Sequence, residues 1–187
     1  MIERRDWTTY NAASCEEKSR FVALLSDLCL TVPQPKQTRG RPRLALSDMV
    51  FASVYKVYVG FYKVYVGFSA RRFTCDLKEA EAGGYVEKAA HFNSVNRYLA
   101  SRDLTEILKD LVTMSSLPMK AIETDFAVDS SGFSTSTYAR WQDAKYGGAS
   151  RREYFKAHLI CGVRTNIVTG VDISGRSVNA RISSSLS

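Results

Sequence analysis

The chain lacks the features that mark membrane-spanning, secreted or zinc-binding proteins. Its 187 residues contain no run of 18 or more apolar residues, and the start from Met1 to Asp6 is not a signal peptide. The four cysteines stand singly at positions 15, 29, 75 and 161, without a Cys-x-x-Cys pair. Unpaired thiols fit a reducing compartment and argue against a zinc site. We therefore expect a soluble cytoplasmic protein with no membrane partner.

Acidic residues are fewer than basic ones. Lysine and arginine number 26 against 19 aspartates and glutamates, which gives a net charge of +7. Such an excess suggests a polyanionic partner, although it is spread along the whole chain and is therefore a weak signal. The hydrophobic share of 45% argues against disorder, and the length suits one compact domain or two small ones.

Helical spacing of apolar residues dominates the first two thirds of the chain. Residues 12–32 predict a helix that Pro33 and Pro35 end. A second helix is expected from Ser47 as its N-cap, with Asp48 in the first turn. Residues 92–99 predict a short helix, and a last one is expected to end before Pro118. The apolar stripes of the first and last helices consist of Phe21, Leu24, Leu25, Leu28 and Val32, and of Leu104, Ile107, Leu108, Leu111 and Val112.

A perfect tandem repeat interrupts the second helix. Tyr55 to Phe61 recurs without change as Tyr62 to Phe68, which indicates a duplication in the coding DNA. Seven residues are almost two helical turns, so a helix absorbs the insertion with a drift of about 20° in facing. In a strand the same insertion would exchange the two faces. We therefore predict a helix here, although the aromatic and β-branched residues favour a strand.

Three polar segments are candidates for DNA contact. Residues 39–43, Arg-Gly-Arg-Pro-Arg, resemble an AT-hook, whose extended backbone lies in the minor groove of A·T-rich DNA. Arg39, Arg41 and Arg43 would then bind DNA; the alternative is a solvated linker. Arg71 and Arg72 either contact phosphate or begin a solvated helix. The third candidate is the polar side of the helix over residues 92–99, formed by Asn93, Asn96 and Arg97, which either reads base edges or faces solvent.

The last third of the chain predicts strands around one acid. A short run of strand-forming residues ends on Asp129, and the turn-forming residues 130–132 follow at once. This arrangement holds a carboxylate at the rim of a sheet, where a divalent cation reaches it; the alternative is a simple turn acid. Residues 151–163 and 167–173 predict two more strands, joined by a tight turn at residues 164–166.

Together, Glu123 to Ser174 resemble the opening of the catalytic domain of bacterial insertion-sequence transposases of the DDE type. The resemblance implies an RNase H-like fold, in which Asp129 is the first catalytic and metal-binding acid. It also implies Mg²⁺ or Mn²⁺ as cofactor, because two such ions, held by three carboxylates, serve DNA cleavage and strand transfer. No other cofactor is expected.

Basic residues around the predicted second strand extend this interpretation. Lys156 and His158 share one face of that strand, and the family often carries such residues near the active centre. His158 is otherwise a structural histidine. Arg140 and Lys145, with Tyr138 and Trp141, form an aromatic and basic cluster that either contacts DNA or covers the sheet.

The sequence departs from the family in its acids. After Asp129 only Asp143, Glu153 and Asp172 follow, and none has the context of the second or third catalytic acid. We therefore expect an α+β protein with a helical DNA-binding region, 1–118, and a partial, truncated RNase H-like domain, 119–187. A single carboxylate does not hold two metal ions, so the fragment should not transpose DNA alone.

Two other interpretations remain open. One is a non-catalytic DNA-binding remnant that occupies insertion-sequence ends or inhibits full-length transposase. The other is an unstable product without function. The expected partners are DNA at element ends and either a second copy of the chain or full-length transposase.

Overall fold

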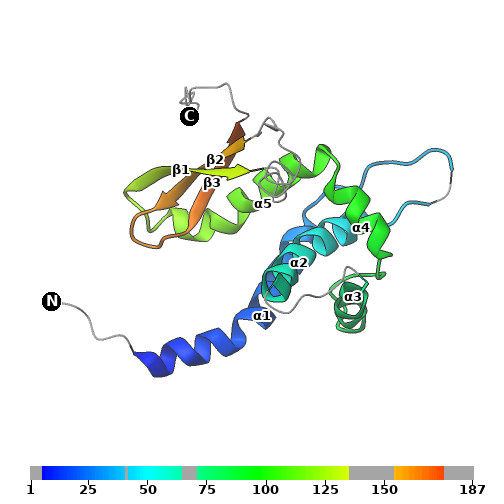
Figure 1. Cartoon of the computed structure of the whole chain (residues 1–187), viewed down its shortest axis with the longest axis horizontal. Helices are drawn as coiled ribbons and strands as arrows, with labels where there is room; N and C mark the ends of the chain where they lie inside the picture. Colours follow the sequence, from blue (N-terminus) through cyan, green and yellow to red (C-terminus); the bar gives the residue numbers. More distant parts are fainter. Residues whose placement is uncertain (1–5, 41, 65–70, 135–153, 175–187) are drawn as a thin grey trace, which may run out of the picture. The chain divides into compact units, whose positions relative to one another are not determined.

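The computed structural model describes residues 6–40, 42–64, 71–134 and 154–174, and shows five helices followed by three strands in them (Figure 1). The α+β class is therefore confirmed. The chain divides into two compact units, Met1–Ile107 and Leu108–Ser187. The division falls inside α5 (Asp103–Lys120), and the boundary predicted from the sequence lies near the end of the same helix. Within the described ranges, no helix is long and apolar enough to cross a membrane.

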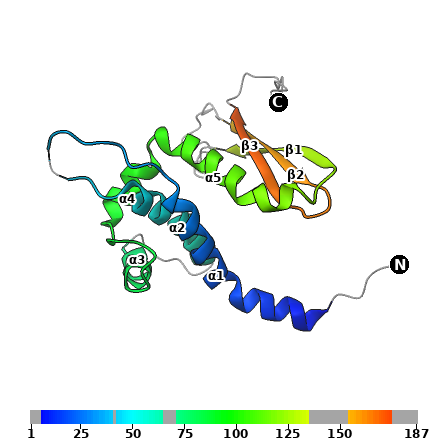
Figure 2. The ribbon, with the colours of Figure 1, turned by 180° about the vertical axis from the view of Figure 1, so that it is seen from behind.

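Helix α1 (Trp7–Leu30) begins earlier than predicted. The Asp6 side chain caps it, because its Oδ1 accepts hydrogen bonds from the N–H groups of Thr8 at 3.0 Å and Thr9 at 3.3 Å. The helix ends before Pro33, as expected. Its residues up to Arg20 are exposed, and Figure 2 shows the first half of α1 extending past the other helices of its unit.

The apolar face of α1 agrees in part with the predicted stripe, since Leu25 is buried, Phe21, Leu28 and Val32 are half-buried, and only Leu24 is exposed. Its buried residues are Val22, Leu25 and Cys29, whereas Leu24 of the predicted stripe is 49% exposed. Both sets repeat every three or four residues, so periodicity alone does not separate them. The contact with α2 (Leu46–Val64) selects the face that is buried.

Helix α2 supplies the centre of the first unit. Its residues Val50, Phe51 and Ala52 are fully buried, and the helix contacts α1, α3 (Phe73–Ala82) and α4 (Phe92–Leu99). The prediction of Ser47 as N-cap is wrong, because the helix already begins at Leu46. The Met49 N–H donates to the Ala45 carbonyl at 3.1 Å, which adds a turn at the N-terminus.

The first copy of the repeat is helical, and one face of it belongs to the core. Tyr55 and Val59 are buried, and the ring of Tyr58 stacks on Phe21 with centroids 4.1 Å apart. The predicted helix is confirmed as far as Val64; residues 65–70 lie outside the described ranges. Tertiary contacts of the aromatic rings outweigh their preference for strands.

The later helices follow the prediction except at one end. The expected helix over residues 92–99 is α4. The predicted end of α5 before Pro118 is wrong, since the helix continues to Lys120. A proline this close to the C-terminus removes one backbone donor and leaves the rest of the helix intact. Leu104 and Leu111 of its predicted stripe are buried.

The second unit contains an antiparallel sheet in the order β1-β2-β3, with β1 (Phe126–Ser134), β2 (Tyr154–Gly162) and β3 (Val168–Ser174) (Figure 1). The expected turn between β2 and β3 is present, and Asn166 within it has a φ of 57°. The prediction that the first strand ends at Asp129 is wrong. Residues 130–132 pair with residues 156–158, so the ladder to β2 outweighs their turn preference.

Glu123 anchors the turn between β2 and β3. This residue is buried, and its carboxylate accepts hydrogen bonds from the N–H groups of Arg164 at 3.2 Å and Thr165 at 2.5 Å. The Thr165 hydroxyl, and then these N–H groups, lower the pKa of Glu123. Gly162 leaves room for it, because a Cβ at this position would lie 2.4 Å from the Glu123 Cδ.

Apolar side chains are exposed on both faces of the sheet. Phe126 and Val128 are exposed on the face that also carries His158, and Phe133, Phe155 and Ile173 are exposed on the other. The strand register defines these two sets, because successive side chains point to opposite faces. A sheet of three strands is too small to cover its own faces, which is consistent with this exposure.

Candidate functional site

Asp129 lies in the middle of β1 rather than at its end. Its side chain is exposed, and its Oδ1 accepts a hydrogen bond from the N–H of Ser130 at 2.7 Å. The residue paired with it on β2 is Leu159, which in turn pairs with Val171 on β3. Asp129 is therefore an accessible oxygen ligand held by a strand and bordered across the sheet by apolar residues.

The other acids of the described sheet lie away from Asp129. Asp125 precedes β1, and its position four residues before Asp129 separates the two acids by about 13 Å. Asp172 pairs with His158, whereas Asp129 pairs with the next residue, Leu159. Asp172 and Asp129 therefore lie on opposite faces. Asp172 instead forms an ion pair with Lys109 of α5, with Oδ1 and Nζ 3.3 Å apart.

The described residues do not fit the two-metal centre that the transposase resemblance implies. No group of three or more histidine, cysteine, aspartate or glutamate side chains able to hold a metal ion occurs among them. Asp143 and Glu153 lie outside the described ranges. On the described sheet, Asp129 is thus a single candidate ligand, and no reaction step through a metal ion follows from this geometry.

Lys156 and His158 share one face of β2, as the two-residue period predicts. The register places this face opposite to the one that carries Asp129. His158 is half-buried, and its Nε2 lies 3.1 Å from the Ser174 Oγ. This contact gives His158 a structural partner on β3, while Lys156 remains exposed.

The basic residues predicted to bind DNA are exposed where the structure describes them. Arg39 and Arg43 lie on the loop between α1 and α2, and Arg71 and Arg72 immediately precede α3. The backbone bends at residues 39–40, so this segment is not extended as in the predicted AT-hook. The remaining predicted residues, Arg41, Arg140 and Lys145, lie outside the described ranges.

The polar side of α4 faces solvent. Asn93, Asn96 and Arg97 are exposed, and Lys56 of α2 donates a hydrogen bond from Nζ to the Asn96 Oδ1. His91 caps the helix, since its Nδ1 accepts a hydrogen bond from the Asn93 N–H at 3.2 Å. An exposed row of amide and guanidinium groups is able to reach base edges, and it is equally compatible with a solvated helix face.

Two acids, Glu123 and Asp48, hold distant segments together, a role that the local sequence around them does not predict. Glu123 binds the β2–β3 turn, and Asp48 is buried with its two oxygens accepting from the N–H groups of Glu87 at 3.2 Å and Lys88 at 3.0 Å. Their partners are about 40 residues away along the chain. No local pattern signals such a contact.

A comparison of the chain with protein-family models, curated proteins and solved structures finds no match.

Proposed function

We propose that this chain is a DNA-binding protein of the DDE-transposase type, which carries the first catalytic acid but not a complete catalytic centre. Its role would lie in DNA transposition, with cleavage and strand transfer at insertion-sequence ends. The observation that carries the proposal is the position of Asp129, exposed on the first strand of a three-stranded antiparallel sheet that follows a helical region. The sequence resemblance identifies this acid with the first catalytic acid of the family. The net charge of +7 favours DNA as partner.

Asp129 would act as one ligand of a divalent cation. A carboxylate is the hard oxygen donor that Mg²⁺ prefers, and a paired strand holds it in a fixed direction. No other acid among the described residues of the sheet joins it, because Asp172 lies on the opposite face and Asp125 lies about 13 Å along the chain. We infer that a second chain completes the site.

The proposal is tested with a supercoiled plasmid that carries the element ends. The chain alone, in Mg²⁺ or Mn²⁺, should bind the plasmid without nicking it above the level of Asp129→Asn. Adding an intact transposase that lacks its own first acid should produce nicking with the wild-type chain and none with Asp129→Asn. Absence of nicking in that mixture, with both proteins folded and bound to DNA, would contradict a catalytic role of Asp129.

A second candidate function is occupation of element ends without catalysis. The isolation of Asp129 on its face of the described sheet favours it. In this case the chain should inhibit an active transposase, and Asp129→Asn should inhibit equally well. Inhibition that depends on Asp129 would instead favour the catalytic role.

A further inference from the structure

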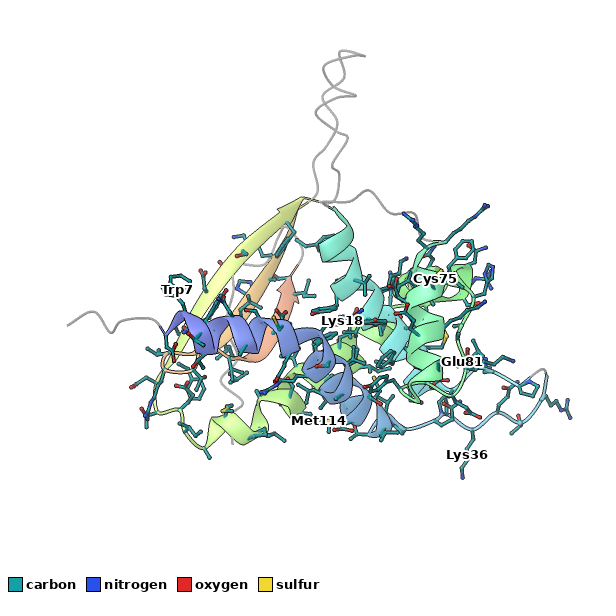
Figure 3. All side chains as sticks on the ribbon, turned by 90° about the horizontal axis from the view of Figure 1, so that it is seen from below. Trp7, Lys18, Lys36, Cys75, Glu81 and Met114 are labelled. Atoms are coloured by element: carbon teal, nitrogen blue, oxygen red, sulfur yellow. The ribbon has the colours of Figure 1, made fainter. Side chains whose placement is uncertain are left out.

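The loop between α1 and α2 is a concentrated positive segment with no acid near it in sequence. Lys36, Arg39, Arg41 and Arg43 fall within eight residues, and no aspartate or glutamate occurs between Asp27 and Asp48. Lys36, Arg39 and Arg43 are exposed, and Figure 3 shows Lys36 on this loop, away from the helices. The charged side chains of this segment are therefore all of one sign, and they lie closer together in sequence than the four cations of the acid-free stretch between Asp48 and Asp76.

The Gln37 side chain fixes the shape of this loop. Its Nε2 donates to the Arg39 carbonyl at 2.9 Å, and its Oε1 accepts from the Arg43 N–H at 3.1 Å. One neutral side chain thus joins the backbone at two of the arginines. These two hydrogen bonds replace the backbone hydrogen bond of a turn. They hold Arg39 and Arg43 on one closed loop.

Gly40 makes this closure sterically possible. Its φ of 95° lies in the region that L-residues rarely adopt. A Cβ added there would lie 3.5 Å from the Gln37 Nε2, which is an ordinary contact, so the backbone conformation and not lack of space favours glycine. The glycine within Arg-Gly-Arg-Pro-Arg therefore has a conformational role in the unbound protein.

A second glutamine closes the base of the loop. The Gln34 Oε1 accepts a hydrogen bond from the Leu46 N–H at 2.5 Å, at the first residue of α2. This contact satisfies one of the backbone donors that a helix N-terminus leaves without an intrahelical partner. The hydrogen bond thus joins the two ends of the loop, residue 34 and residue 46. Compact surface loops of this size commonly have their ends close together.

We propose that the described parts of this loop, residues 34–40 and 42–46, are preorganised to bind the phosphate backbone of duplex DNA, with Arg39 and Arg43 as contacts and Gln37 as a positioning residue. The inference rests on the proposed function in taking DNA as the partner. Arginine suits phosphate because its guanidinium forms two parallel hydrogen bonds. A loop that is already closed loses less conformational entropy on binding.

A duplex fits this loop better than a membrane surface does. Residues 33–43 include no aliphatic or aromatic side chain other than proline, and the aliphatic residues that follow, Leu44, Ala45 and Leu46, are half-buried at the start of α2, so the loop offers little apolar surface to a bilayer. The charge alone would attract either polyanion. Vesicles of phosphatidylserine and phosphatidylcholine therefore belong in the test.

The test measures binding of the full chain to a short duplex by fluorescence anisotropy at several salt concentrations. Arg39→Gln with Arg43→Gln should lower the slope of log K against log salt by about 1.8, at about 0.9 for each lost phosphate contact. The matched control is Lys78→Gln with Lys120→Gln, which removes two exposed charges outside the loop and should leave the slope unchanged.

The positioning role has its own readout. Gln37→Met should weaken binding about threefold to tenfold without changing the salt slope, because the phosphate contacts still form but the loop must order first. Gly40→Ala should act in the same direction. Thr38→Val, a similar polar-to-apolar change in the same loop, should bind as the wild type does. Unchanged melting temperatures confirm that each variant is folded.

Two results overturn the proposal and separate it from the proposed function. If the wild type binds DNA and the loop variants match their controls, DNA contact lies elsewhere, and the proposed function survives. If the wild type binds the vesicles but no DNA, both the loop proposal and the proposed function fail.

Discussion

Asp129 and Asp172 show that a difference of one residue in strand register places two side chains on opposite faces of a sheet. Ser130 pairs with His158 and through it with Asp172, so Asp129, one residue earlier, points to the other face. The candidates of the sheet are thereby divided between two surfaces, with Asp129 on one face and Lys156 and His158 on the other. No other acid of the described strands shares the face of Asp129, the carboxylate that the resemblance identifies as catalytic.

The cysteines should differ sharply in reactivity. Burial, and then the negative charge of Asp48, raise the pKa of Cys29 to about 12, whereas Cys15 and Cys75 are exposed. Thiolate is the reactive form, so Cys29 should resist alkylation of the folded chain at neutral pH. Mass spectrometry after a brief iodoacetamide pulse would measure this. Modification of Cys29 as fast as Cys15 would contradict the packing of α1 on α2.

Glu123 should make the β2–β3 turn sensitive to acid. Its pKa in the folded chain is lower than the ordinary value of 4.5. The contribution of Glu123 to the stability of the turn is therefore fully present above about pH 4.5. It is lost as the pH falls through the lower folded-state pKa. Hydrogen-exchange protection of the Arg164 and Thr165 amides should decrease over that range.

Two variants isolate this effect. Glu123→Gln should show weaker protection of the two amides at neutral pH and little further change in acid, because the charge is gone. Asp125→Asn, at a nearby exposed acid, should keep the wild-type pH dependence. Equal pH dependence in wild type and Glu123→Gln would mean that another group controls the turn.

At the level of elements, the sequence predicted type and order well and boundaries less well. The helices around Phe51 and Val95 and the three consecutive strands agree with prediction. Two of the errors lie where a distant contact competes with a local preference. Ser130 to Gly132 continue a strand because β2 pairs with them, and α1 buries Val22 rather than Leu24 because of α2.

The candidate site was predicted only in part, for the same reason. An exposed acid on the first strand follows from the local pattern, and the structure places Asp129 there. Its isolation follows from the register, which depends on a partner strand about 30 residues away. The closure of the basic loop by Gln37 depends on a side-chain amide, which no periodicity reveals.

The buried side chains in the first copy of the tandem repeat should contribute most of that copy's stabilisation of the folded chain. Tyr55 is 3% exposed and Val57 is 56% exposed. Tyr55→Ala should therefore lower the free energy of unfolding by about 3–5 kcal/mol, the range for deletion of a buried aromatic ring. Val57→Ala should change it by less than about 0.5 kcal/mol. Chemical denaturation compares the two, and equal effects would contradict the helical facing of the repeat.

At the scale of the whole molecule, the two proposed functions, DNA binding and metal binding, belong to different compact units. The first contains α1 to α4 and the basic loop, and the second contains the sheet with Asp129. DNA binding would therefore depend on the first unit, and completion of a metal site on the second. Loss of the Asp129 carboxylate should leave DNA affinity unchanged, since the contacts proposed for DNA lie on other residues.

The salt dependence of duplex DNA binding by the full chain, measured in EDTA, tests the central claim most directly. We expect log K to fall linearly with log salt, with a smaller slope when Arg39 and Arg43 are replaced. Asp129→Asn should leave both the affinity and the slope unchanged. A folded chain that does not bind duplex DNA even at low salt would contradict this claim, because every proposed role of this protein begins with DNA.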